Sequence, residues 1–110
     1  MSHPSWPSAE EIREIASRVP ELIRFGTSSW TYPGWKGLIY EKDYPATGSS
    51  AAMLEEYAHW PLFRSVGIDS FFYAPPSAKT LTAYSESLPP DFPCVTKVWD
   101  RITAHTFANP

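Results

Sequence analysis

In residues 66–99 the sequence reads VGIDSFFYAPPSAKTLTAYSESLPPDFPCVTKVW, and this stretch decides the fold class. Its two ends, residues 66–72 and 92–99, have the length and the β-branched and aromatic content of strands. Between them, Ser77 can cap a helix whose apolar side chains recur at helical spacing, at Leu81, Tyr84 and Leu88. A strand, a helix and a second strand in this order predict two parallel strands joined by a helical crossover.

The same alternation extends toward the N-terminus. Ser8 and Glu11 have the spacing of a capping box at the start of an amphipathic helix. Residues 22–27 have strand length and end in a glycine and small polar residues, and helical spacing resumes from Ser50. Residues 30–48, between these two elements, are rich in proline, glycine and aromatic residues, which indicates a long loop. Three helix–strand pairs in succession predict an α/β fold with parallel strands.

Composition excludes several classes of protein. The chain has 110 residues, 43% hydrophobic and 19% charged, which indicates a single globular domain. Its net charge of −3 provides no basic surface for nucleic acid or an anionic membrane. The single cysteine, Cys94, excludes an internal disulfide and a zinc site built from cysteines. No apolar run reaches the roughly 20 residues of a membrane-spanning helix, and residues 1–8 lack the apolar region of a signal peptide, so a cytoplasmic protein is expected.

The predicted elements also suggest how the chain is organised. Residues 1–7, which include two prolines, are expected to form a disordered lead. Three parallel strands leave two unprotected sheet edges, and no element after the third predicted strand would cover them. We therefore expect residues 8–110 to be the incomplete N-terminal portion of a single domain, and we expect this truncated chain to self-associate.

Three blocks of the sequence resemble a known family. They are GTSSWTYPGW at residues 26–35, VGIDSFFYAPPS at residues 66–77 and FPCVTKVWDRIT at residues 92–103. In order and spacing they resemble the domain of unknown function 72 family, also called YecE-like proteins. The resemblance implies a (β/α)8 barrel of the TIM type, of which this chain would supply the first three βα units. The chain departs from the family pattern at Gly67, where an acidic residue is usual, and at Asp69, where asparagine is usual.

Alternation along the strands predicts which side chains point into such a barrel. Val66 and Ile68 mark the face covered by helices, which leaves Asp69 on the inner face. Lys97 has inner parity in the third strand, near the carboxyl end at which barrel active sites lie. We expect Asp69 and Lys97 to face each other, with Tyr73 close by, as the candidate catalytic residues. A lysine beside a carboxylate can bind an anion or act as a tuned proton donor, and the alternative is a structural ion pair.

The candidate substrate-binding residues lie just beyond the predicted strand ends: Ser28, Trp30, Tyr32, Trp35, Arg101 and His105. Ser28 and its neighbour Ser29 could offer backbone N–H groups to a phosphate, or they form a tight turn. The aromatic rings suit stacking on sugars or nucleobases, or they fill the core of the long loop. Arg101 is the candidate exposed anion contact. Parity further places Arg24 and Phe71 on the inner face, and Cys94 on the outer face as a small buried residue.

Together these residues favour an enzyme that acts on an anionic, phosphoester or carbohydrate-like substrate. The alternative is a non-catalytic protein of the same fold that binds a ligand or single-stranded nucleic acid by stacking. The net charge of −3 counts against nucleic acid for this segment. The histidines have no ligand-like partners at short spacing, so no metal site is predicted, and the sequence identifies no cofactor.

Overall fold

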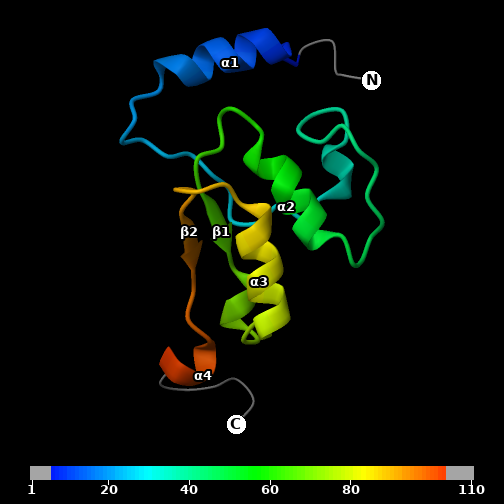
Figure 1. The fold of residues 1–110 in the computed structure, drawn as a ribbon, viewed down its shortest axis with the longest axis vertical. Helices are drawn as coiled ribbons and strands as arrows, with labels where there is room; N and C mark the ends of the chain where they lie inside the picture. Colours follow the sequence, from blue (N-terminus) through cyan, green and yellow to red (C-terminus); the bar gives the residue numbers. More distant parts are fainter. Residues whose placement is uncertain (1–5, 104–110) are drawn as a thin grey trace.

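A computed structural model describes residues 6–103 (Figure 1). In chain order its elements are α1 (Ala9–Arg18), the 3-10 helix η1 (Pro33–Trp35), α2 (Ser50–Ala58), β1 (Val66–Ile68), the 3-10 helix η2 (Ser70–Phe72), α3 (Ala78–Ser87), β2 (Cys94–Thr96) and α4 (Asp100–Thr103). This mixture of helices with a parallel sheet is compatible with the predicted α/β class. Within the described range, every helix falls short of the length and apolarity needed to cross a membrane.

The sheet consists of β1 and β2, which run parallel and are joined by α3 (Figure 1). Val66 pairs with Cys94, and the next two residues of each strand pair in the same register. The predicted parallel pair is therefore confirmed. Both strands are shorter than the predicted spans 66–72 and 92–99. The chain turns into η2 after Asp69, so β1 ends there and the ladder with β2 cannot continue.

Residues 22–27, predicted as a strand, form no strand in the structure, yet they run beside β1. The carbonyl oxygen of Phe25 accepts hydrogen bonds from the backbone N–H groups of residues 64 and 65, at 2.9 and 3.2 Å. The carbonyl oxygen of Thr27 accepts from the N–H of Gly67 at 2.7 Å. Successive N–H groups along a strand point to opposite edges, so residues 22–27 lie on the edge of β1 opposite β2.

Tyr57 and Gly26 explain why this third ladder is incomplete. The N–H of Thr27 donates to the Tyr57 hydroxyl at 2.8 Å instead of to a carbonyl of β1, and that hydroxyl donates to the Ser65 carbonyl at 2.9 Å. Burial raises the pKa of Tyr57 above its ordinary value, so the hydroxyl keeps its proton. At Gly26 an added Cβ would lie 2.1 Å from the same Ser65 carbonyl oxygen, an approach that only glycine permits.

Side-chain caps begin two of the helices, as predicted. The Ser8 hydroxyl accepts from the N–H of Glu11 at 3.2 Å, and the Glu11 carboxylate accepts from the N–H of Ser8 at 3.1 Å. At α3 the Ser77 hydroxyl accepts from the N–H of Thr80 at 3.1 Å. Each such cap stabilises its helix by about 1 kcal/mol.

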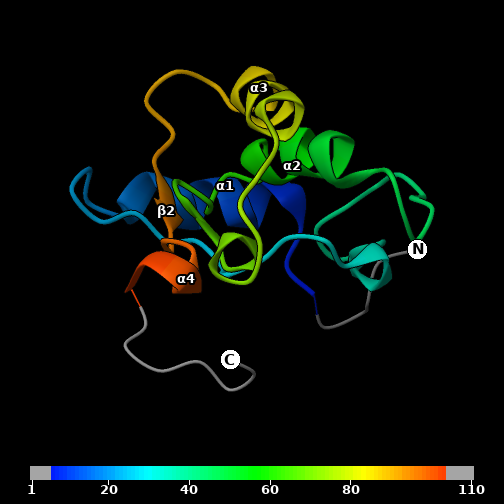
Figure 2. The same ribbon diagram turned by 90° about the horizontal axis from the view of Figure 1, so that it is seen from below.

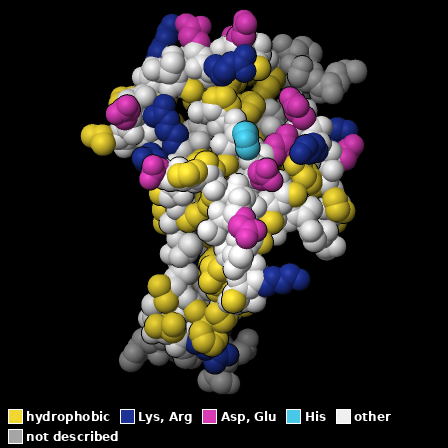
Figure 3. Space-filling view, viewed as in Figure 1, with side chains coloured by type: hydrophobic (Ala, Val, Ile, Leu, Met, Phe, Trp, Pro, Cys, Tyr) yellow, Lys and Arg dark blue, Asp and Glu magenta, His cyan; other side chains and the backbone are white. Residues whose placement is uncertain are grey.

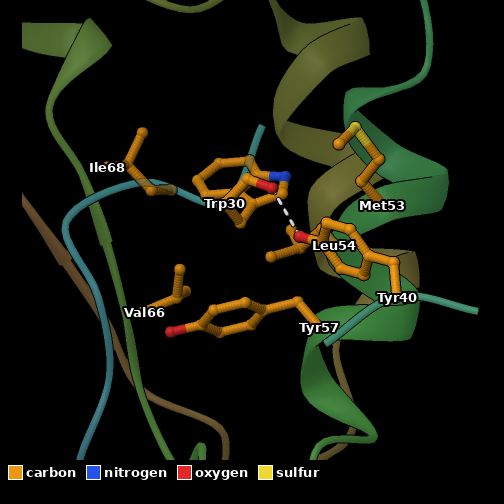
Figure 4. Packing of buried hydrophobic residues seen from close by; sticks show 7 residues of the cluster. All are labelled: Trp30, Tyr40, Met53, Leu54, Tyr57, Val66 and Ile68. Carbon is orange, nitrogen blue, oxygen red and sulfur yellow. Dashed lines mark hydrogen bonds between the residues drawn. The ribbon is translucent and has the colours of Figure 1, made fainter. Parts of the chain in front are cut away.

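The hydrophobic core lies between α2 and one face of β1 (Figure 4). The buried cluster consists of Trp30, Tyr40, Met53, Leu54, Tyr57, Val66 and Ile68. Val66 and Ile68 supply the strand side of it, which confirms that this face of β1 is the helix-covered one. Helix α3 packs against α2, and Figure 2 shows the two helices together on one side of the molecule.

In contrast, β2 is exposed along its whole length. The prediction of a buried Cys94 is therefore wrong, because α3 packs mainly against α2 and leaves Cys94 exposed. Neighbouring atoms still remove enough water from the thiol to raise the pKa of Cys94. On the other face, Val95 is 71% exposed.

Candidate functional site

The candidate site lies where the chain leaves β1 and β2. Asp69 follows the last residue of β1 and Lys97 follows the last residue of β2, so the parallel register brings the two side chains to the same end of the sheet. The Lys97 ammonium lies 3.7 Å from a carboxylate oxygen of Asp69. The predicted proximity of these residues is confirmed, and their chemical role stays a prediction.

Solvent reaches both members of the pair. The side chain of Lys97 is 62% exposed and that of Asp69 is 49% exposed. A pair this accessible to water stabilises a fold by at most about 1 kcal/mol, far less than a core contact. The separation of 3.7 Å is also longer than a hydrogen bond, and the Lys97 ammonium donates none to any residue within 6–103. The geometry therefore leaves the three ammonium N–H donors available to another acceptor.

An aromatic pair borders the ammonium. The Lys97 nitrogen lies 5.8 Å from the centre of the Phe72 ring, within the range of a cation–π contact. The Phe72 and Tyr73 rings meet edge to face with their centres 5.2 Å apart. Tyr73 is 74% exposed, so its ring can stack on a ligand at this end of the sheet. This end of the sheet therefore brings together a cation, a carboxylate and two aromatic rings.

The match to a family model covers residues 24–109 and carries the description "Protein of unknown function DUF72". The chain belongs to the DUF72 family. Comparison with curated proteins and with solved structures found no match. The DUF72 match includes β1, β2 and the site residues Asp69, Tyr73 and Lys97, whereas α1 precedes it.

Trp30, which lies within the DUF72 segment, is a core residue and does not offer its ring to a ligand. It is 3% exposed, and its indole N–H donates to the Ser50 carbonyl at 2.8 Å. Its ring also meets Tyr84 edge to face at 5.2 Å. The expectation of a stacking surface at Trp30 is therefore corrected, because residues 30–48 close over α2 and bury their first aromatic ring. The alternative interpretation, packing of the loop core, describes this residue.

The other two aromatic candidates lie nearer the surface. The rings of Tyr32 and Trp35 are tilted against each other with their centres 4.8 Å apart. Tyr32 is exposed, while Trp35 is half-buried and its ring contacts the buried ring of Tyr40 at 5.7 Å. Only Tyr32 of these two offers an open ring face, and ligand binding there stays a prediction.

The structure separates the cationic candidates. Arg24, expected on the inner face, instead donates to the carbonyl of Asp91 at 3.1 Å. Arg101 lies on the exposed side of the short helix α4. His105 lies outside the described residues. Among the side chains of residues 6–103, no group of three acidic, histidine or cysteine residues is arranged to hold a metal ion.

Strand alternation alone missed the contribution of Phe72. If the strand alternation continued through Phe71, that side chain would point to the inner face. Instead, η2 begins at Ser70 and rotates the side chains that follow. Phe71 consequently packs against the core and stacks near Tyr84, while Phe72 lies near Lys97. The prolines at 75 and 76 signal a turn, but no sequence pattern shows that it starts as early as Ser70.

Proposed function

We propose that this DUF72 chain forms the first three βα units of a (β/α)8 barrel. Three features support the proposal: β1 and β2 are parallel, α3 connects them, and residues 22–27 run beside the remaining edge of β1. This order of neighbours is the order in which a barrel adds strands. The exposed residues of β2 are also those that a following strand and helix would cover in a closed barrel.

We further propose that the carboxyl end of this sheet binds a small anionic ligand. The observation that carries the proposal is the Lys97 ammonium, which is exposed and makes no hydrogen bond within the described residues. Asp69, at 3.7 Å, holds the ammonium at the sheet end without occupying its N–H donors. An incoming anion would then gain charge-assisted hydrogen bonds from Lys97.

The same residues fit an enzyme that acts on a phosphoester or carbohydrate-like anion. In such an enzyme Lys97 binds the anionic group, Asp69 accepts a proton, and Tyr73 supports the ligand ring by stacking. The alternative is a binding protein for single-stranded nucleic acid, which the exposed rings of Tyr32 and Tyr73 favour. The net charge of −3 opposes it for this chain.

The anion proposal is tested by titrating the full chain with sodium acetate, inorganic phosphate and a ten-nucleotide deoxythymidine strand at low ionic strength. Lys97→Met removes the cation while keeping most of the aliphatic stem. Lys42→Met is the matched control, because Lys42 is an exposed lysine in a different part of the chain. Circular dichroism establishes that both variants keep the wild-type fold.

We expect Lys97→Met to weaken phosphate binding about tenfold, the effect of losing one charge-assisted contact, and Lys42→Met to leave it within twofold. Equal affinities in the two variants would contradict the anion site. Tight binding of the oligonucleotide with no dependence on Lys97 would favour the nucleic-acid alternative.

A further inference from the structure

In the turn after Gly26, two successive backbone N–H groups have no hydrogen-bond acceptor within the described residues. Three of its carbonyl oxygens accept hydrogen bonds: that of Thr27 from the Gly67 N–H, that of Ser29 from the Thr27 hydroxyl at 2.6 Å, and that of Trp30 from the Tyr40 hydroxyl and the Tyr32 N–H. The Ser28 carbonyl accepts none within residues 6–103. Its N–H groups are not occupied in the same way. Those of Ser28 and Ser29 donate to no acceptor among residues 6–103.

Two successive backbone N–H groups without an acceptor give that side of the turn a positive electrostatic potential. Successive free N–H groups of this kind form concave sites for anions. Ser28 is exposed and Ser29 is partly exposed, so solvent or a ligand can reach this part of the turn. The Thr27 side chain fixes the turn by its hydrogen bond to Ser29, so a ligand need not order the backbone first.

Gly67 places this turn over the same face of the sheet as Lys97. An added Cβ at Gly67 would lie 3.0 Å from the Cα of Ser28, so the Ser28 backbone covers the side of β1 to which that Cβ would point. Gly67 pairs with Val95, and paired residues of parallel strands point to the same face. Lys97 is two residues beyond Val95 and has the same parity. The N–H groups of Ser28 and Ser29 and the ammonium of Lys97 therefore lie on the same face of the sheet.

We propose that the anionic group bound at this site is a phosphate, which bridges the N–H groups of Ser28 and Ser29 and the ammonium of Lys97. This inference rests on the proposed anion site and specifies its ligand class as inorganic phosphate or a phosphomonoester. A phosphate presents oxygens in a tetrahedral arrangement and can accept from the turn and from the ammonium at once. A carboxylate has only two oxygens, which lie in one plane, so it fits donors that approach from the turn and from the ammonium less well than a phosphate does. Gly67 acts as a positioning residue, since it lets the turn approach.

The test is a ¹H–¹⁵N NMR titration of the full chain with inorganic phosphate, with sodium acetate as the comparison anion. We expect phosphate to move the amide signals of Ser28 and Ser29 downfield in a saturable manner. Acetate is expected to require at least tenfold higher concentration for the same amide shift. In Lys97→Met the amide titration with phosphate shifts to about tenfold higher concentration, whereas in Lys42→Met it is unchanged.

A second variant tests the turn separately. Gly67→Ala is expected to weaken phosphate binding about tenfold by displacing Ser28, while acetate binding at Lys97 changes less than twofold. If phosphate binding depends on Lys97 but the amides of Ser28 and Ser29 do not move, the bridge is wrong and the anion site stands. If the amides move equally in the wild type and in Lys97→Met, the bridge is also wrong. If neither anion binds in a Lys97-dependent way, both the bridge and the anion site are wrong.

Discussion

At the scale of single residues, two aromatic side chains proposed for the site have opposite environments. Trp30 and Tyr73 each lie beyond a predicted strand, residues 22–27 and 66–72, yet Trp30 is buried and Tyr73 is 74% exposed. The difference arises because Trp30 lies under α2 and donates its indole N–H to Ser50, whereas Tyr73 ends η2 at the surface. A position just beyond a predicted strand therefore does not determine whether an aromatic side chain is buried.

This contrast gives the first prediction. Trp30→Ala is expected to lower the free energy of unfolding by about 3–5 kcal/mol, because it removes a buried ring from the core. Tyr73→Ala is expected to change it by less than about 0.5 kcal/mol, since the side chain is largely in water. Urea unfolding curves of the two variants measure both values. Equal losses of stability in the two variants would show that the contrast in burial is wrong.

At the scale of elements, the close approach of residues 22–27 to β1 gives the second prediction. Gly26→Ala would place a Cβ 2.1 Å from the Ser65 carbonyl oxygen, so the segment must move and its hydrogen bonds to β1 must lengthen. We expect a loss of about 2 kcal/mol or more. Gly34→Ala is the control, because an added Cβ there meets no heavy atom within 4 Å. A Gly26→Ala variant as stable as Gly34→Ala in thermal unfolding would contradict the observed contact.

Some features of the elements could be predicted from the sequence and others could not. Local signals predict the helices that Ser8 and Ser77 cap, because capping depends on a few consecutive residues. The pairing of β1 with β2, and with it the meeting of Asp69 and Lys97, follows from alternation and a short crossover. Residues 22–27 do not form the predicted strand because the N–H of Thr27 donates to the hydroxyl of Tyr57, which lies 30 positions away in the sequence. The burial of Trp30 and the exposure of Cys94 likewise depend on which elements pack over them.

At the scale of the whole molecule, one group of exposed apolar side chains lies around the second strand and the helix after it. Val95, Val98 and Ile102 are all exposed, and Figure 3 shows apolar side chains gathered at the lower end, over α4 and the chain leading into it. An exposed strand with apolar neighbours is a template for pairing with another chain. The surface therefore favours association between molecules.

From this surface we predict that the chain self-associates in a concentration-dependent way. Sedimentation velocity from about 10 to 500 μM is expected to show the average mass rising above that of a monomer. Val95→Lys, which places a charge on the exposed strand, should reduce the association, while Lys79→Glu on α3 serves as a control for a change of surface charge. A single monomeric species over the whole range would contradict the prediction.

The most direct test of the central claim concerns the four lysines of the chain, Lys36, Lys42, Lys79 and Lys97. NMR spectra that detect the side-chain nitrogens can follow all four during one titration with inorganic phosphate. We predict that the Nζ signal of Lys97 shifts most and saturates, because its ammonium lies at the sheet end without a hydrogen bond in the described structure. Lys36, which is paired with Asp43 at 2.8 Å, should shift least. Equal small shifts at all four lysines would contradict an anion site at the carboxyl end of the sheet.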